Sequence, residues 1–231
     1  IFNSRKKDTS KLKIYIDGHA VNTVKTTKFL GISIDDDLKW KTHVNEILLK
    51  ISKTIGVMSK LKHCLPKSIL LTLYNSLVLP YLSYNTIVWG ACSKYLLERI
   101  NLLQKRAVRI ISKMSYDSHT KPLFYKLNVL PVSLLYDYQV LCFMYSYNNN
   151  MLPETFDNLF VQNKSIHNYN TRSANDFRVQ YGKTSFTNSN FICRAPELWN
   201  MLPNTVKQCS TIKSFKSKIK KHLLQKFIIN N

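Results

Sequence analysis

The chain has few glycines and no paired cysteines. Only five of its 231 residues are glycine, and none builds the glycine-rich loop that cradles a phosphate, of either the Walker or the dinucleotide type. The five cysteines are scattered, odd in number and free of any Cys-x-x-Cys pair. This pattern disfavours a disulfide framework or a zinc finger. We expect reduced thiols in an intracellular protein of the nucleus or cytoplasm.

Acidic residues are also scarce. Thirteen Asp and Glu stand against 34 Lys and Arg, which leaves a formal net charge of +21. A field of this sign attracts polyanions, so nucleic acid is the first partner to consider. The alternative is the bias of an AT-rich gene, because Lys, Asn, Ile, Tyr and Phe are all abundant.

The sequence offers no clear catalytic or metal-binding cluster. His43, His119 and His167 have no His or Cys at the spacing of a zinc site, and no Ser-His-Asp or Cys-His arrangement is apparent. Residues 35–37 are all Asp, and phosphoryl transfer needs carboxylates that hold Mg²⁺ ions about 3.5–4 Å apart. Consecutive strand residues point to opposite faces, however. We therefore expect these three acids to end a strand and cap a helix that begins near Leu38.

The run from Ser68 to Ser93 contains no charged residue and is long enough to cross a bilayer. Pro80 lies in its middle, and its several Tyr, Asn and hydroxyl side chains would lack partners in lipid. We predict two buried helices that break at Pro80 and no stable membrane insertion.

The N-terminal part is predicted to be β structure. Lys13–Ile16 and His19–Val24 flank Asp17-Gly18, a strong two-residue hairpin turn. Lys28–Ile34 has apolar residues mostly in period two, which predicts a half-buried strand, and Gly31 within it predicts a bulge or a close approach of another backbone. Ile1 and Phe2 resemble the stub of an earlier strand, so we expect upstream sequence to complete the sheet.

Helical periodicity follows from Trp40 onward. The expected helices span residues 40–61, 66–77, 81–89, 94–112, a buried helix around 134–144, and a basic terminal helix with its apolar stripe between Ile212 and Phe227. In the 94–112 helix, capped by Ser93, we place a group of polar side chains opposite the apolar face. These are Gln104, Lys105, Arg106 and Arg109.

Several short motifs resemble one family, the reverse transcriptases of non-LTR (LINE-type, jockey-like) retrotransposons. The first is Lys28-Phe29-Leu30-Gly31 followed by Asp35 or Asp36, Leu38, Trp40 and His43. The others, in family order, are Pro80–Tyr84, Val88–Gly90, Leu103–Ile111, His119–Phe124, His167–Ser173 and Leu198–Pro203. The resemblance covers nearly the whole chain.

The resemblance implies a mainly α chain with a small N-terminal antiparallel β hairpin and strand (α+β). Residues 1–38 would end the palm, 39–147 form a thumb-like helical bundle, 148–192 a polar linker and 193–231 a basic helical region. Lys28, Phe29, Leu30 and Gly31 would be the primer grip, which holds the 3′ end of the growing strand. The family's catalytic aspartates lie on earlier palm strands, upstream of this chain. The Mg²⁺ needed for polymerisation is thus implied for the full-length enzyme, together with upstream palm and fingers, and the chain alone should not polymerise.

Gln104, Lys105, Arg106 and Arg109 could track the phosphates of a template-primer duplex, and replacing the three basic residues by Ala should then flatten the salt dependence of binding. The simpler alternatives are a solvated helix face and an ordinary core strand at Lys28–Gly31. Weaker phosphate candidates are Arg172, Lys213, Lys216, Lys218, Lys220 and Lys221. Two other functions remain open: a degenerate or co-opted non-catalytic module that binds nucleic acid, and a peripheral protein whose basic terminal helix lies on anionic lipid.

Overall fold

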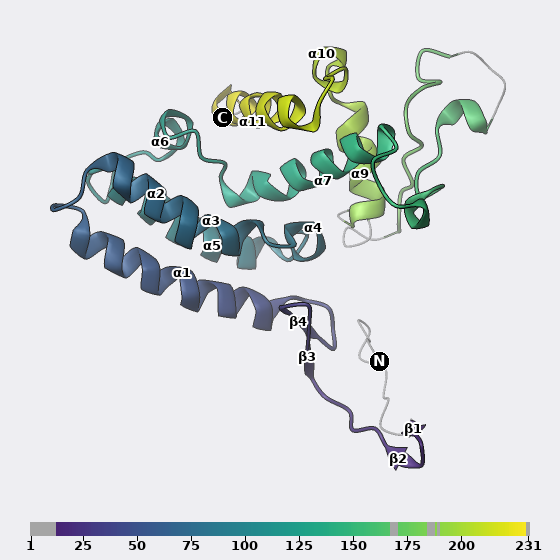
Figure 1. Cartoon of the computed structure of the whole chain (residues 1–231), viewed down its shortest axis with the longest axis horizontal. Helices are drawn as coiled ribbons and strands as arrows, with labels where there is room; N and C mark the ends of the chain where they lie inside the picture. Colours follow the sequence, from purple (N-terminus) through teal and green to yellow (C-terminus); the bar gives the residue numbers. More distant parts are fainter. Residues whose placement is uncertain (1–12, 167–170, 184–187, 189, 230–231) are drawn as a thin grey trace.

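A computed structural model describes residues 13–166, 171–183, 188 and 190–229. These residues are mainly helical, with two small antiparallel hairpins at the N-terminal end (Figure 1), which confirms the predicted α+β class. The proposed strand stub at Ile1 and Phe2 lies outside the described residues, as do positions 167–170 of the motif 167–173.

The first hairpin forms where the sequence predicted it. Strands β1 (Tyr15–Ile16) and β2 (His19–Ala20) pair antiparallel. Asp17 and Gly18 both have positive φ, 48° and 77°, as expected for the two-residue turn that matches the twist of a hairpin. Every residue of these strands is exposed, and Figure 1 shows the hairpin projecting away from the helices.

A second hairpin replaces the continuous strand predicted for residues 28–34. Strands β3 (Thr26–Phe29) and β4 (Ile32–Asp35) pair antiparallel, joined by Leu30 and Gly31 with φ of 45° and 79°. The bulge prediction was therefore wrong, because Gly31 occupies the second position of a two-residue turn. Period-two alternation is the same on both sides of such a turn, so the pattern could not distinguish one strand from two.

Helix α1 (Lys41–Leu61) begins three residues later than predicted. Leu38 and Trp40 both have left-handed backbone, with φ of 56° and 64°, and therefore cannot belong to the first turn. The predicted capping by acids is confirmed in part: an Asp35 carboxylate oxygen accepts a hydrogen bond from the Thr42 amide at 3.3 Å. Of the predicted apolar stripe, Val44, Ile47, Ile51, Ile55 and Met58 are buried, Trp40 and Leu48 are half-buried, and Leu61 is exposed.

The next four helices along the chain follow α1, and one of them, α4, is a single turn. They are α2 (Lys67–Leu77), α3 (Leu79–Ser83), α4 (Thr86–Trp89) and α5 (Lys94–Ser112). The break before Pro80 is confirmed. The helix expected over residues 81–89 is divided, because Asn85 adopts φ of 47° between α3 and α4. No described helix is long and apolar enough to cross a membrane.

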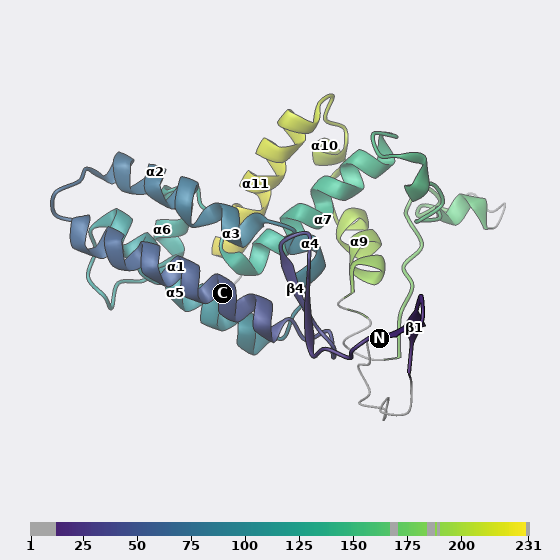
Figure 2. The ribbon, with the colours of Figure 1, turned by 60° about the horizontal axis from the view of Figure 1, so that its bottom comes forward.

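Helices α1 and α5 run side by side (Figure 2). Arg99 Nη1 donates to Asn45 Oδ1 at 2.8 Å near the start of both helices, so they are parallel. The bounds of α5 are those predicted, but Ser93 makes no side-chain capping bond. Ser93 does occupy the predicted N-cap position, where its carbonyl accepts hydrogen bonds from the amides of Leu96 and Leu97.

The C-terminal half packs around one buried helix. The elements are α6 (Lys121–Lys126), α7 (Val132–Asn148), α9 (Phe191–Asn200), α10 (Asn204–Lys207) and α11 (Ile212–Ile229). Helix α7 contacts α5, α9 and α11, in agreement with the prediction that it is buried. The stripe Phe215, Ile219 and Leu223 of α11 is buried too. Because packing inside the protein occupies this face, α11 does not present it to lipid.

The polar segment between α7 and α9 is attached to the core by aromatic side chains. It contains two short 3₁₀ turns, Glu154–Phe156 and Asn163–Ser165. Phe160 and Phe177 are buried, and Tyr147 Oη donates to the Phe160 carbonyl at 2.9 Å. The described part of the segment therefore contributes to the core, while the predicted boundaries at 148 and 192 stay a prediction.

Candidate nucleic-acid interface

The β3–β4 hairpin displays the residues predicted as a primer grip. Phe29 is 64% exposed and Leu30 is 70% exposed, whereas Ile32 across the turn is 5% exposed. Lys28 pairs with Ser33 in the ladder. At the tip, Tyr84 Oη donates to the Leu30 carbonyl at 2.7 Å. The predicted residues thus form an exposed, anchored turn rather than a core strand.

The part of this hairpin near its tip is fixed to α1 through Ser33. Its hydroxyl donates to Glu46 Oε1 at 2.8 Å, and its amide donates to His43 Nδ1 at 3.4 Å. His43 is buried, its ring edge lies against Trp89 with centroids 5.7 Å apart, and its Nε2 has no hydrogen-bond partner among the described residues. Burial lowers the pKa of His43 below its usual 6.5, with Lys50 and Lys28 acting in the same direction.

We expect acid to weaken the attachment of this hairpin. The unfolded chain binds more protons at His43 than the folded chain between the lowered pKa and pH 6.5, so stability falls as the pH drops through that window. His43→Asn keeps an acceptor for the Ser33 amide and does not titrate. Urea unfolding at about pH 7.5 and about pH 5.5 should show a smaller acid-induced loss in this variant than in the natural chain.

A matched change tests whether the effect belongs to His43. Burial also lowers the pKa of His222 on α11. The contribution of His222 to the acid-induced loss of stability should persist in His43→Asn and disappear in a variant that replaces both histidines. An acid-induced loss that His43→Asn leaves unchanged would contradict the assignment.

Gln104 on α5 does not lie where the sequence placed it. Its side chain is fully buried. Nε2 donates to Tyr74 Oη at 2.8 Å and to the Leu130 carbonyl at 2.9 Å, and Oε1 accepts from the Val132 amide at 2.7 Å. Placing it on the polar side was wrong, because its hydrogen-bonding capacity is used inside the protein to join α5 to α2 and the start of α7.

The three basic residues predicted on α5 have different surroundings. Arg106 is exposed. Lys105 Nζ lies 3.2 Å from Glu98 Oε1, an exposed pair that contributes little to stability and can exchange partners. Arg109 Nε donates to the Ser118 carbonyl at 2.9 Å, and its guanidinium lies over the Tyr116 ring. Arg109 therefore supports the turn after α5, and Arg106 is the most accessible of the three.

Basic residues that the sequence did not single out as a site lie beside Arg106. Arg99 lies two turns before it on the same edge of α5, where Arg99 contacts Asn45 of α1, and Lys113 follows α5 directly, with a left-handed backbone (φ of 56°). Lys53 and Lys60 are exposed on α1, off its buried stripe. We call these five residues the basic rim. The seven-residue spacing of Arg99 and Arg106 was visible in the sequence, whereas the packing of α1 against α5 is seen only in the structure.

The weaker candidates lie elsewhere. Lys213, Lys216, Lys218 and Lys221 are exposed on α11, and Arg172 is exposed in the segment before α9. Lys220 is half-buried, and burial lowers its pKa. Figure 1 places α11 on the far side of α7 from α1. The structure therefore does not bring these residues together with the basic rim.

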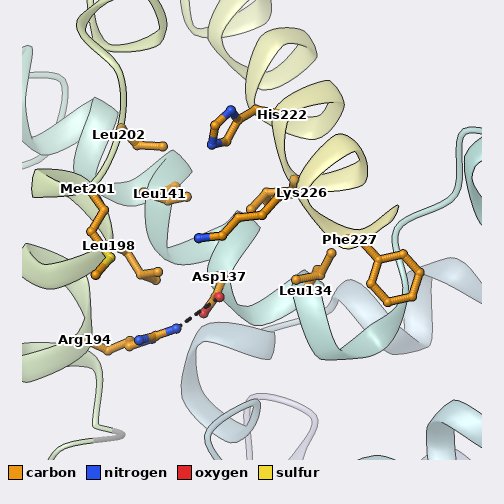
Figure 3. A pocket seen from close by; sticks show the side chains of 11 residues that line it. Leu134, Asp137, Leu141, Arg194, Leu198, Met201, Leu202, His222, Lys226 and Phe227 are labelled. Atoms are coloured by element: carbon orange, nitrogen blue, oxygen red, sulfur yellow. Dashed lines mark hydrogen bonds and ion pairs between the residues drawn. The ribbon is translucent and has the colours of Figure 1, made fainter. Parts of the chain in front are cut away.

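A separate cavity of about 230 Å³ lies between α7, α9 and α11. Figure 3 shows Arg194 of α9 next to Asp137 of α7. His222 and Lys226 line the cavity from α11, together with several leucine side chains. Arg194 is 3.3 Å from Asp137 Oδ2 and 2.9 Å from Glu197 Oε2. Burial raises the pKa of Asp137, although Arg194 opposes the shift. The Arg194–Asp137 ion pair joins α9 to α7, whereas Glu197 lies on α9 itself.

The acidic side chains do not fit a catalytic magnesium site. Asp35 is directed to the Thr42 amide, and Asp37 Oδ2 lies 2.7 Å from Lys39 Nζ, a hydrogen bond that lowers the pKa of Asp37. Across the residues that the structure describes, no three His, Cys, Asp or Glu side chains gather closely enough to hold a metal ion. We assign no metal-dependent step to this chain.

One curated protein relates the chain to a known activity. The chain is 26% identical over 111 residues to the RNA-directed DNA polymerase from mobile element jockey of Drosophila melanogaster. The match covers 47% of this chain and 12% of that protein, so the chain spans a small part of its relative's length. No family model and no solved structure matches the chain. The chain is therefore a distant relative of a reverse transcriptase encoded by a mobile element.

Proposed function

We propose that this chain is the part of a retrotransposon reverse transcriptase that grips the template-primer duplex. The hairpin tip at Lys28–Gly31 would hold the end of the growing strand, and the basic rim would hold the duplex behind it. Palm and fingers of the same polyprotein would supply the carboxylates that bind Mg²⁺. In such a division of work, the helices act by positioning, which contributes much of the rate in in-line phosphoryl transfer.

The basic rim is the observation that carries the proposal. Arg99 on α5 donates to Asn45, and Ser52 and Ser59 follow Asn45 at seven-residue spacing on α1, so small polar residues share that side of α1. Each of the two helices contains one acid, and both acids have partners, since Glu46 accepts from Ser33 and Glu98 accepts from Asn101 and Lys105. A surface of this kind binds phosphates without reading the bases.

Salt dependence of duplex binding tests the role of the rim. We expect the variant Lys53→Ala/Lys60→Ala/Arg106→Ala to bind an RNA–DNA duplex more weakly. We expect the slope of log affinity against log salt to fall by roughly two to three, since each lost phosphate contact removes about 0.9. Fluorescence anisotropy across a series of salt concentrations measures both quantities.

The matched control removes the same charge from α11. Lys213→Ala/Lys218→Ala/Lys221→Ala changes three exposed lysines away from the rim and should leave most of the slope intact. Equal losses in the two variants would mean that net charge alone attracts the duplex, which contradicts the proposed grip.

Primer extension tests the proposed division between grip and chemistry. We expect the chain alone to incorporate no deoxynucleotide on a primed RNA template, because its described carboxylates do not converge. Magnesium-dependent incorporation by the purified chain would contradict this division.

A further inference from the structure

The β3–β4 hairpin and helix α3 together form a surface with exposed aromatic rings. Tyr84 follows α3 and is 52% exposed, and Tyr81, three residues earlier, is 40% exposed. Phe29 at the hairpin tip is more exposed than either. No residue of this surface outside the hairpin belongs to the grip described above.

Side chains of α1 place the two tyrosines next to the hairpin. His43 and Glu46 contact Ser33 near the hairpin tip. One turn further along α1, Lys50 Nζ lies over the Tyr81 ring, 5.1 Å from its centroid. Tyr81 therefore lies beside the hairpin, along the same side of α1.

Tyr84 closes a ring of contacts that makes this surface rigid. Its hydroxyl holds the Leu30 carbonyl, and its ring lies against Gly31, where an added Cβ would be 3.6 Å from Cε1. Its own carbonyl accepts from Trp89 Nε1 at 2.9 Å. Trp89 contacts His43, which in turn accepts a hydrogen bond from the Ser33 amide of the hairpin. The tip and α3 are thus held at a constant separation.

The charges of this surface suit a polyanion. Lys50 stands over Tyr81, and Lys28 lies opposite Ser33 in the ladder. Two of the nearby acids are directed inward, Glu46 to Ser33 and the buried Asp35 to the Thr42 amide, and the exposed Asp36 follows β4 at the end of the hairpin opposite the tip. Aromatic rings beside lysines on a fixed support are the features with which proteins hold unpaired nucleotides, because every base has a face that stacks.

We propose that the surface formed by Phe29, Tyr81, Tyr84 and Lys50 binds single-stranded nucleic acid that extends from the gripped duplex. This inference rests on the proposed function and adds a second partner to it. The basic rim holds paired strands by their phosphates, whereas this surface stacks the unpaired bases. Tyr84 acts as a positioning residue, because its hydroxyl fixes the tip that carries Phe29.

Duplexes with and without a single-stranded extension test the proposal on the full chain. We expect a duplex with a thymidine extension of about five nucleotides to bind roughly tenfold more tightly than the blunt duplex. Tyr81→Leu should abolish this difference and leave blunt-duplex affinity unchanged. Tyr84→Phe, which removes the hydroxyl alone, should reduce the difference and speed amide exchange at Leu30–Ser33. The control is Tyr125→Leu, which changes a tyrosine on α6 that is more exposed than Tyr81 and should change neither affinity.

Each contrary result has a separate meaning. Equal affinity for the two duplexes would overturn this inference and leave the duplex grip standing. Failure to bind the blunt duplex would overturn the proposed function instead. Self-association that Tyr81→Leu abolishes, with no gain from the extension, would assign the surface to a second copy of the chain and also overturn the inference.

Discussion

Replacing Gln104 by Ala should lower the free energy of unfolding by about 3–5 kcal/mol, the largest effect that we expect from a single substitution in this chain. The change leaves the Tyr74 hydroxyl, the Leu130 carbonyl and the Val132 amide without the partner that each has in the folded state. All three lie in the core, where an unmade hydrogen bond costs about 1–3 kcal/mol. Urea unfolding followed by circular dichroism measures the loss.

Two companion variants separate the hydrogen bonds from the other effects. Gln104→Leu fills most of the volume but restores no hydrogen bond, so it should remain destabilised by more than about 2 kcal/mol. Arg106→Ala, two residues further on the exposed side, should stay within about 0.5 kcal/mol of the natural chain. A stable Gln104→Leu would show that packing volume, rather than the amide, is what this position requires.

Gly90→Ala should destabilise the chain by about 1–3 kcal/mol through overpacking. The backbone of Gly90 is ordinary, but a Cβ there would lie 2.5 Å from the Thr86 carbonyl oxygen and 2.8 Å from Tyr136 Cδ2. The carbonyl belongs to the backbone of α4 and Tyr136 is buried on α7, so neither can move freely. The position requires glycine because α4 approaches α7 closely there.

Gly56→Ala is the matched control for this substitution. Gly56 lies within α1, and a Cβ there would meet nothing within 4 Å. Alanine should therefore stabilise the helix by about 0.5–1 kcal/mol. If close approach explains Gly90, thermal unfolding should show a lower melting temperature for Gly90→Ala and a higher one for Gly56→Ala. Equal shifts of the two melting temperatures would contradict that explanation.

The helices could be predicted well because their signals are local. The stripe on α1, the bounds of α5 and the break before Pro80 each depend on residues within a few turns. Gln104 could not be placed in this way. Helical periodicity put it near the polar edge of α5, and its burial depends on Tyr74 and Leu130, which are distant in sequence. A polar residue looks the same in a sequence whether it is buried or exposed, so the pattern along α5 could not show that Gln104 is buried.

The turn at Leu30 and Gly31 shows a different limit. Alternating apolar residues predict a strand with equal strength on both sides of a two-residue turn, so periodicity did not reveal the hairpin. Its anchoring is also invisible in the sequence, because Tyr84 is 54 positions from the Leu30 carbonyl that it holds. The primer-grip residues were predicted as a motif, whereas their exposed position became clear only from the structure.

The amino-acid order alone determined the helical class, the excess of positive charge and the two-residue turn at Asp17-Gly18, since these follow from composition and from neighbours along the chain. Tertiary packing decided which polar groups face solvent, that Arg99 of α5 lies against Asn45 of α1, and that Tyr84 holds the hairpin tip. The reason is physical: a surface is made by elements that meet in space, and their meeting depends on burial summed over the whole core.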